Sequence, residues 1–179
     1  MVLARLPIIG VMGSGSEDGL PLAADLGRFL AQQPVHLLTG GGGGTMAAVS
    51  RAFYETPGRR GLVVGVLPCA TRETPTIPKP GYPNPWVELP IRTHLPYSGE
   101  RGEDPLSRNP INVLSADLVV ALPGGAGTAS EIRLAHAYGR PIIHLSPNSN
   151  PFIEKHNLTR ANNLIDFQTF FQTWLAGFR

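Results

Sequence analysis

The sequence predicts an α/β protein with a Rossmann-like open parallel sheet and helices on both faces, in a single domain over residues 1–179. Short runs of β-branched residues alternate along the chain with amphipathic helical stretches, which is typical of parallel strands joined by crossover helices. Three glycine-rich loops follow directly after predicted strands. A chain of 179 residues is long enough to bury one sizeable core.

The N-terminal part of the chain predicts three strands separated by two helices. The first strand is a run of Ile, Val and Met, and the first helix carries Leu and Phe at helical spacing. The second helix ends before Pro57, and Pro68 ends the third strand. The predicted strands are 8–13, 35–39 and 62–67, and the predicted helices are 20–33 and 45–55.

Residues 71–105 form a proline-rich excursion that differs in composition from the rest of the chain. The segment contains eight prolines and few periodic positions, and the one strand predicted in it is 86–89. A long excursion of this kind in a compact domain indicates a functional segment or a subunit contact, with a passive surface loop as the alternative.

The C-terminal part predicts three helices and two strands, and one of the helices ends at Gly139. The last helix places four aromatic residues on one side, which we expect to pack in the core or against a second subunit: Phe167, Phe170, Phe171 and Trp174. The predicted helices are 108–114, 127–138 and 166–178, and the predicted strands are 117–122 and 141–145.

Composition and charge narrow the functional classes. Thirteen of the 15 basic residues are arginine, the side chain suited to bidentate phosphate or carboxylate contacts, although a genome rich in arginine codons would give the same bias. No basic run marks a nucleic-acid surface, so nucleic acid is not an expected partner. Cys69 is the only cysteine, which excludes an internal disulfide and a cysteine-rich zinc site. Without a membrane-length apolar run or a signal-peptide pattern, we expect a cytoplasmic protein with no membrane partner.

Glycine-rich loops are the strongest indication of function. Five successive glycines, 40–44, lie between a predicted strand and a predicted helix, and Thr39 and Thr45 add hydroxyl groups on either side. Such a loop brings backbone N–H groups close to an anion, and the following helix directs its positive end there. Residues 123–128 repeat this arrangement, and residues 13–16 form a third loop. One such loop is equally well a tight turn, but three at one sheet edge predict a binding site.

Three common cofactor-binding patterns do not match. From Gly13, the dinucleotide-binding spacing requires a glycine where this chain has Asp18, and Gly19 comes one residue too late. No glycine loop carries the Gly-Lys-Ser/Thr of a P-loop. Neither Lys79, between prolines, nor Lys155, in a polar stretch, is placed for a pyridoxal phosphate Schiff base.

Two charged residues flank the loop at 123–128. Arg108 precedes it, and Glu131 lies in the helix that it opens. A carboxylate repels phosphate, so Glu131 suits this site if it faces an uncharged part of the ligand, a developing oxocarbenium ion or a cation such as Arg108. The alternative is a first-turn glutamate that complements the helix dipole. Arg133 and His136 are expected to be surface or packing residues.

Residues 123–131 read Pro-Gly-Gly-Ala-Gly-Thr-Ala-Ser-Glu, which resembles the P-G-G-x-G-T-x-x-E signature of the LONELY GUY superfamily, long mislabelled as lysine decarboxylases. The resemblance spans roughly residues 7–147 and includes the glycines at 40–44. It implies a Rossmann-like homo-oligomer that cleaves a nucleoside 5′-monophosphate into free base and ribose 5-phosphate. Arg108 and Glu131 align with the catalytic pair of these enzymes. The glutamate would stabilise a cationic ribosyl transition state or orient water, and the arginine would support charge on the substrate.

The chain departs from these enzymes around Arg108. Their M-H-x-R-K stretch reads Pro-Leu-Ser-Arg-Asn at residues 105–109, so the arginine remains while the histidine and lysine do not. Residues 107–117 and 38–46 are instead similar to the molybdenum cofactor carrier subfamily, whose members bind and protect a pterin that bears a phosphate and a metal-oxo group. The resemblance therefore implies a carrier of molybdenum cofactor (molybdopterin) or, alternatively, a phosphoribohydrolase of the cytokinin-activating type.

The predicted partners are a small anionic phosphorylated ligand and further copies of the chain, as a dimer or tetramer. Molybdenum cofactor is the candidate carried ligand, and no cofactor for catalysis and no metal ligands are predicted. Arg108 and Glu131 are catalytic residues only if the chain is an enzyme. The residues predicted to bind the ligand or its phosphate are Gly13, Ser14, Thr39, Gly41, Gly42, Gly43, Gly44, Thr45, Arg108, Asn109, Gly124, Gly125, Gly127 and Thr128.

Overall fold

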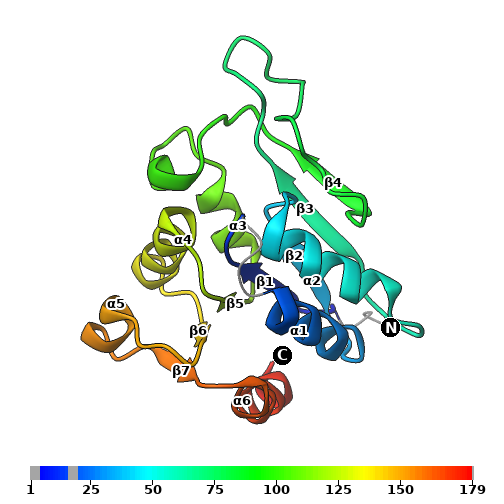
Figure 1. Cartoon of the computed structure of the whole chain (residues 1–179), viewed down its shortest axis with the longest axis vertical. Helices are drawn as coiled ribbons and strands as arrows, with labels where there is room; N and C mark the ends of the chain where they lie inside the picture. The colour runs from blue at the N-terminus through cyan, green and yellow to red at the C-terminus, as the bar shows by residue number, and fades with distance from the viewer. Residues whose placement is uncertain (1–4, 16–19, 179) are drawn as a thin grey trace.

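A computed structural model describes residues 5–15 and 20–178 of the chain (Figure 1). Within these residues, seven parallel strands form one open sheet in the order β4-β3-β2-β1-β5-β6-β7. The strands are β1 (Ile8–Met12), β2 (His36–Thr39), β3 (Val63–Leu67), β4 (Leu89–Arg92), β5 (Leu118–Ala121), β6 (Ile142–Leu145) and β7 (Thr159–Ala161). The helices are α1 (Leu20–Ala31), α2 (Gly44–Glu55), the 3₁₀ turn η1 (Gly99–Arg101), α3 (Asn109–Ser115), α4 (Ala126–Ala137), α5 (Pro151–Lys155) and α6 (Leu164–Gly177).

The order of the strands determines where a ligand can bind. From β1 the chain adds β2, β3 and β4 on one side, and it then returns to add β5, β6 and β7 on the other. Strands β1 and β5 are therefore neighbours across a topological switch point, with Ile9 opposite Leu118 and Met12 opposite Ala121. In open parallel sheets the loops at such a point diverge at the carboxyl ends of the strands and leave a crevice.

Helices cover both faces of the sheet (Figure 1). One face packs against α1, α2 and α6 in a core that includes Leu26, Phe53 and Phe171. The other packs against α3, α4 and α5, with Val113 and Ile132 buried there. The predicted fold class is therefore confirmed.

The last helix clarifies the predicted role of its aromatic residues. Phe167 and Phe171 are fully buried against the sheet, and Phe170 and Trp174 are partly buried beside them. The interpretation of this group as core residues is confirmed, because Phe167 and Phe171 pack in the hydrophobic core of the chain itself. The helix begins two residues before the predicted start, where the Asn163 side chain accepts a hydrogen bond from the Asp166 amide at 2.9 Å.

The strand predicted at 86–89 was placed too early, since β4 covers Leu89–Arg92. The Asn84 side chain accepts a hydrogen bond from the Trp86 amide at 3.2 Å, and this turn delays the strand. Strand β4 lies at the sheet edge, where the missing N–H of Pro90 is tolerated. Sequence reasoning missed α5 and β7, which carry no apolar run: β7 has two exposed positions out of three, and Ile153 is the buried residue of α5.

The proline-rich excursion crosses the edge of the sheet and returns to the carboxyl ends of the strands. It contributes β4 and η1, and its first part projects at the top of the view in Figure 1. Across residues 5–15 and 20–178, no helix is both long and apolar enough to cross a membrane.

Candidate functional site

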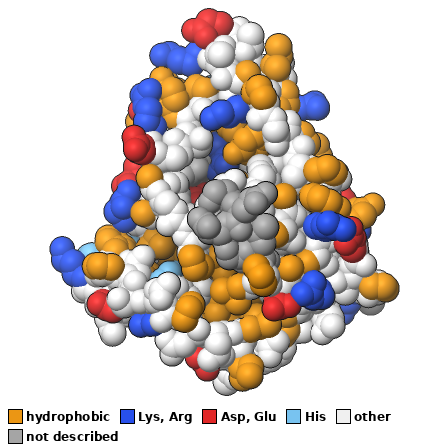
Figure 2. Space-filling model, viewed as in Figure 1, with side chains coloured by type: hydrophobic (Ala, Val, Ile, Leu, Met, Phe, Trp, Pro, Cys, Tyr) orange, Lys and Arg blue, Asp and Glu red, His pale blue; other side chains and the backbone are white. Residues whose placement is uncertain are grey.

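A cavity of about 270 Å³ opens at the switch point between the carboxyl ends of β1 and β5. The space-filling view shows a hollow above the grey atoms, with basic and acidic side chains visible within it (Figure 2). Four separate parts of the chain meet here: the loops after β1, β2 and β5, and the proline-rich excursion with the start of α3. The lining residues are Val11, Met12, Gly13, Ser14, Gly15, Gly40, Met46, Tyr82, Ser98, Gly99, Arg108, Asn109, Gly125, Gly127, Thr128 and Glu131.

Ser14 ties the three glycine-rich loops together through its backbone. Its N–H donates to the carbonyl of Pro123 at 3.3 Å, and its own carbonyl accepts from the N–H of Thr45 at 2.9 Å. The loops approach so closely that a Cβ at Gly13 would lie 2.5 Å from Cγ2 of Thr45. Glycine is required here by the contact between loops. The last residue of the loop predicted at 13–16 lies outside the described residues.

The five-glycine loop mainly accommodates side chains from elsewhere in the chain. A Cβ at Gly40 would lie 2.2 Å from a terminal nitrogen of Arg108, and a Cβ at Gly42 would lie 2.7 Å from the ring of Tyr82. Gly41 has a φ of +75°, and its N–H donates to the fully buried Oγ1 of Thr39 at 3.0 Å. Within this loop, only Gly40 lines the cavity.

The loop after β5 presents the N-terminus of α4 to the cavity. Gly125 is the N-cap residue and has no side chain that caps the helix, and Gly127 and Thr128 follow in the first turn. The first N–H groups of a helix have no partner within it, and the helix dipole makes this end positive. Thr128 is 4% exposed, and its Oγ1 has no hydrogen-bond partner among the described residues. These groups form a donor-rich end suited to an anion.

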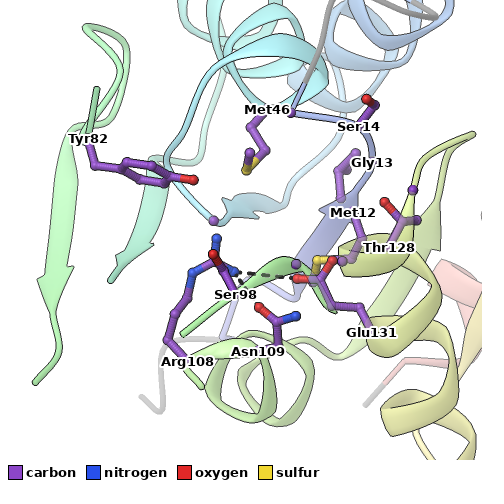
Figure 3. A pocket seen from close by; sticks show the side chains of 16 residues that line it. Met12, Gly13, Ser14, Met46, Tyr82, Ser98, Arg108, Asn109, Thr128 and Glu131 are labelled. Atoms are coloured by element: carbon purple, nitrogen blue, oxygen red, sulfur yellow. Dashed lines mark hydrogen bonds and ion pairs between the residues drawn. The ribbon is translucent and has the colours of Figure 1, made fainter. Parts of the chain in front are cut away.

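Arg108 and Glu131 form a buried ion pair on one wall of the cavity (Figure 3). The closest atoms, Nη1 and Oε1, are 3.5 Å apart, and the residues are 4% and 7% exposed. Arg108 also donates to Oδ1 of Asn109 at 2.9 Å, and Asn112 donates to Oε1 of Glu131 at 3.1 Å. Asn109 in turn donates to Oγ of Ser130 at 2.9 Å. The predicted pairing is thus present, supported by a hydrogen-bonded chain that joins α3 to α4.

Burial controls the charge of Glu131. Removal from water raises the pKa of this carboxyl group, and this exceeds the opposing effects of the Arg108 charge and the Asn112 hydrogen bond. Nε of Arg108 has no hydrogen-bond partner among the described residues. The pair therefore reduces the repulsion that a lone carboxylate would exert on an anion, and it leaves one arginine donor unused.

Sequence reasoning missed the contributions of the excursion. Tyr82, Ser98 and Gly99 line the cavity, and Asn84 holds the segment against the five-glycine loop. The N–H of Asn84 donates to the carbonyl of Gly41 at 2.7 Å, and its side-chain amide donates to the carbonyl of Gly42 at 2.9 Å. No spacing motif marks these residues, although the composition had identified the segment as a functional candidate.

The predicted binding residues divide into two groups. The structure brings together at the cavity Gly13, Ser14, Arg108, Asn109, Gly125, Gly127 and Thr128, together with Glu131. The others are not among the residues that line the cavity: Thr39, Gly41, Gly42, Gly43, Gly44, Thr45 and Gly124. Gly15 and Gly40 belong to loops predicted to form the site although they were not among the predicted binding residues, and sequence reasoning missed Val11, Met12 and Met46.

The arrangement can bind an anion at the α4 end and position a buried acid–base pair beside the rest of the ligand. In the part of the chain that the structure describes, no three His, Cys, Asp or Glu side chains are grouped to hold a metal ion.

Comparison with known proteins identifies a family, a relative and similar solved structures. The model of the SLOG cluster4 family matches residues 6–171. An uncharacterized protein from Archaeoglobus fulgidus is 30% identical over 145 residues, which are 80% of this chain and 82% of the relative. The Moco carrier protein from Chlamydomonas reinhardtii has a structure with a TM-score of 0.74 and 30% identity, covering 97% of this chain and 100% of that one. The molybdenum cofactor binding protein from Rippkaea orientalis has a TM-score of 0.72 and 30% identity, covering 96% and 98%.

Proposed function

The chain belongs to the SLOG cluster4 family, and we propose that it is a carrier that binds molybdenum cofactor in the cavity between β1 and β5. The likeness to two proteins named for this cofactor, each 30% identical and spanning nearly the whole chain, is the observation that carries the proposal. It also supports the resemblance drawn from residues 107–117 and 38–46.

Three features of the cavity support the binding of a phosphorylated pterin. The N-terminus of α4 and the hydroxyl of Thr128 offer donors to the phosphate. Arg108 lies beside Glu131 and reduces the repulsion between this carboxylate and the ligand. Met12 and Met46 add polarizable thioethers that pack against a planar ring without placing a charge there.

Phosphoribohydrolase activity is the second candidate, and the retained ion pair is the observation that favours it. A hydrolase would use the charge of Glu131 to stabilise a ribosyl cation. Burial raises the pKa of the Glu131 carboxyl group and so favours its neutral form. Where the carboxylate is ionised, the charge of Arg108, 3.5 Å away, offsets its field. Less negative charge is then available to the sugar, which favours the carrier.

Two measurements on the full chain test the proposal. The protein is incubated without oxygen with molybdenum cofactor released from a molybdoenzyme, and the retained pterin is quantified after gel filtration. In parallel, a panel of nucleoside 5′-monophosphates is assayed for free base. We expect cofactor to be retained and no base to be released. Base release that falls about 100-fold or more in Glu131→Gln would establish the hydrolase instead.

Thr128→Val provides a matched test of the site, because it preserves the shape of the side chain and removes an Oγ1 that has no partner in the described chain. Loss of a hydrogen bond to a charged group should weaken retention of the cofactor by roughly 10-fold or more. Thr173→Val, on the exposed surface of α6, is the control. Equal retention by both variants would argue against this end of the cavity as the phosphate site.

A further inference from the structure

The cavity has two chemically different ends. Figure 3 shows Tyr82 at one end and Ser14 and Thr128 at the other, with Met46 above and Arg108, Asn109 and Glu131 below. The Thr128 end supplies the first turn of α4 and an unpartnered buried hydroxyl. The Tyr82 end supplies a phenol ring and a thioether. This polarity fits an elongated ligand with an anion at one end and a ring at the other.

We propose that Tyr82 determines the ligand class of this cavity: it contacts the planar heteroaromatic ring of a ring-bearing phosphate, whose phosphate lies at the N-terminus of α4. The proposal rests on the proposed function only in taking this cavity as the ligand site. It goes further by placing the ring of the ligand at the Tyr82 end, and by assigning a role in ligand selection to a residue of the proline-rich excursion.

The backbone around Tyr82 holds its ring in place. The N–H of Tyr82 donates to the carbonyl of Lys79 at 3.0 Å, and Asn84 anchors the following residues to the carbonyls of Gly41 and Gly42. The ring rests on Gly42, where a Cβ would lie 2.7 Å from Cζ and Oη. Glycine at position 42 therefore lets the ring lie against the loop, and a ring fixed in advance costs little entropy when it contacts a ligand.

The same contact explains why the cavity would distinguish a ring-bearing phosphate from a bare oxyanion. The groups at the Thr128 end can bind any anion of suitable size. Tyr82 and Met46 lie away from that end and add binding energy only for a ligand with an apolar or aromatic part that reaches them. Loss of an aromatic contact with a base weakens binding by about 5- to 100-fold.

The test compares four probes by calorimetry on the full chain: adenosine 5′-monophosphate, neopterin monophosphate, ribose 5-phosphate and molybdate. We expect at least one ring-bearing phosphate to bind more tightly than ribose 5-phosphate and molybdate. Tyr82→Ala should weaken that probe about 5- to 100-fold and leave ribose 5-phosphate unchanged. Tyr97→Ala is the control, since Tyr97 lies in the same excursion against Arg101 and does not line the cavity.

A second pair of variants leaves Tyr82 itself unchanged. Gly42→Ala should displace the ring and weaken the same probe selectively, whereas Gly177→Ala, at the end of α6, should not, because a Cβ there meets nothing within 4 Å. Equal weakening of ribose 5-phosphate and the ring-bearing probes by Tyr82→Ala would overturn the proposal, as would tighter binding of molybdate than of both ring-bearing probes. Failure to retain molybdenum cofactor, with ring-probe binding still dependent on Tyr82, would refute the proposed carrier function alone.

Discussion

Two adjacent glycines in the loop after β5 should differ in how much stability they lose on the same substitution. A Cβ at Gly124 would lie 2.1 Å from Oγ1 and 2.7 Å from Cβ of Thr128, and 3.0 Å from the backbone nitrogen of Ser14. Thr128 is in the first turn of α4 and is 4% exposed, so it has little room to move. Overpacking of this kind costs about 1–3 kcal/mol, and we expect Gly124→Ala to lose that much stability.

Gly125 is the matched control. A Cβ there meets nothing within 4 Å, and its φ of −92° is accessible to alanine. Alanine restricts the unfolded chain, which favours folding by about 0.4–1 kcal/mol, but it is a poorer N-cap residue than glycine. These effects oppose each other, so Gly125→Ala should change the free energy of unfolding by less than about 1 kcal/mol.

Urea unfolding followed by the fluorescence of the two tryptophans measures both variants. With an m value of about 2 kcal/mol/M, the midpoint of Gly124→Ala should fall by roughly 0.5–1.5 M, while that of Gly125→Ala stays near the wild type. Equal midpoint shifts, or a larger shift for Gly125→Ala, would refute the reasoning that loop contact rather than ligand approach requires Gly124.

Three further predictions concern charge, ligand access and assembly. Burial raises the pKa of Glu131, so the wild type should lose stability relative to Glu131→Gln as the pH rises from the ordinary pKa of 4.5 towards the raised pKa. Urea titrations of both proteins at several pH values measure this, and a difference in unfolding free energy that stays constant with pH would contradict it. Gly125→Val should abolish binding of the cavity ligand by blocking close backbone approach, which calorimetry would detect, and unchanged affinity would exclude this loop as the anion site. The chain should form a dimer or tetramer by light scattering, since the edge strand β4 exposes Leu89 and Ile91 by 48% and 41%; a monomer at working concentration would count against it.

Local sequence patterns were sufficient for the five inner strands of the sheet and for most helices. The β-branched runs that became β1 and β5 are buried on both faces, and such runs have few alternatives to a central parallel strand. The boundaries at β4 were harder, because the turn that delays the strand depends on the Asn84 side chain. The elements β7 and α5 were missed because β7 has two exposed positions out of three and α5 buries Ile153 alone, so neither shows an apolar run in the sequence.

The candidate site shows a similar division. The signature at 123–131 located the α4 end of the cavity and Glu131, and the resemblance to the superfamily paired Arg108 with this glutamate. The five glycines were interpreted as one anion loop, and the structure adds that Gly40 and Gly42 accommodate side chains from distant parts of the chain. Such contacts depend on the path of the proline-rich excursion, which composition alone does not specify. Tyr82 was therefore missed.

The backbone of Ser14 joins the loops after β1 and β5 to the start of α2 through two hydrogen bonds. A ligand that settles against any one of these loops consequently stabilises the contacts of all three and, with them, the centre of the sheet. Occupancy should then appear as a rise in melting temperature, because a ligand at 100 times its Kd adds about 2.7 kcal/mol to the folded state. Thermal denaturation of the whole chain can therefore rank candidate ligands before any chemical step is known.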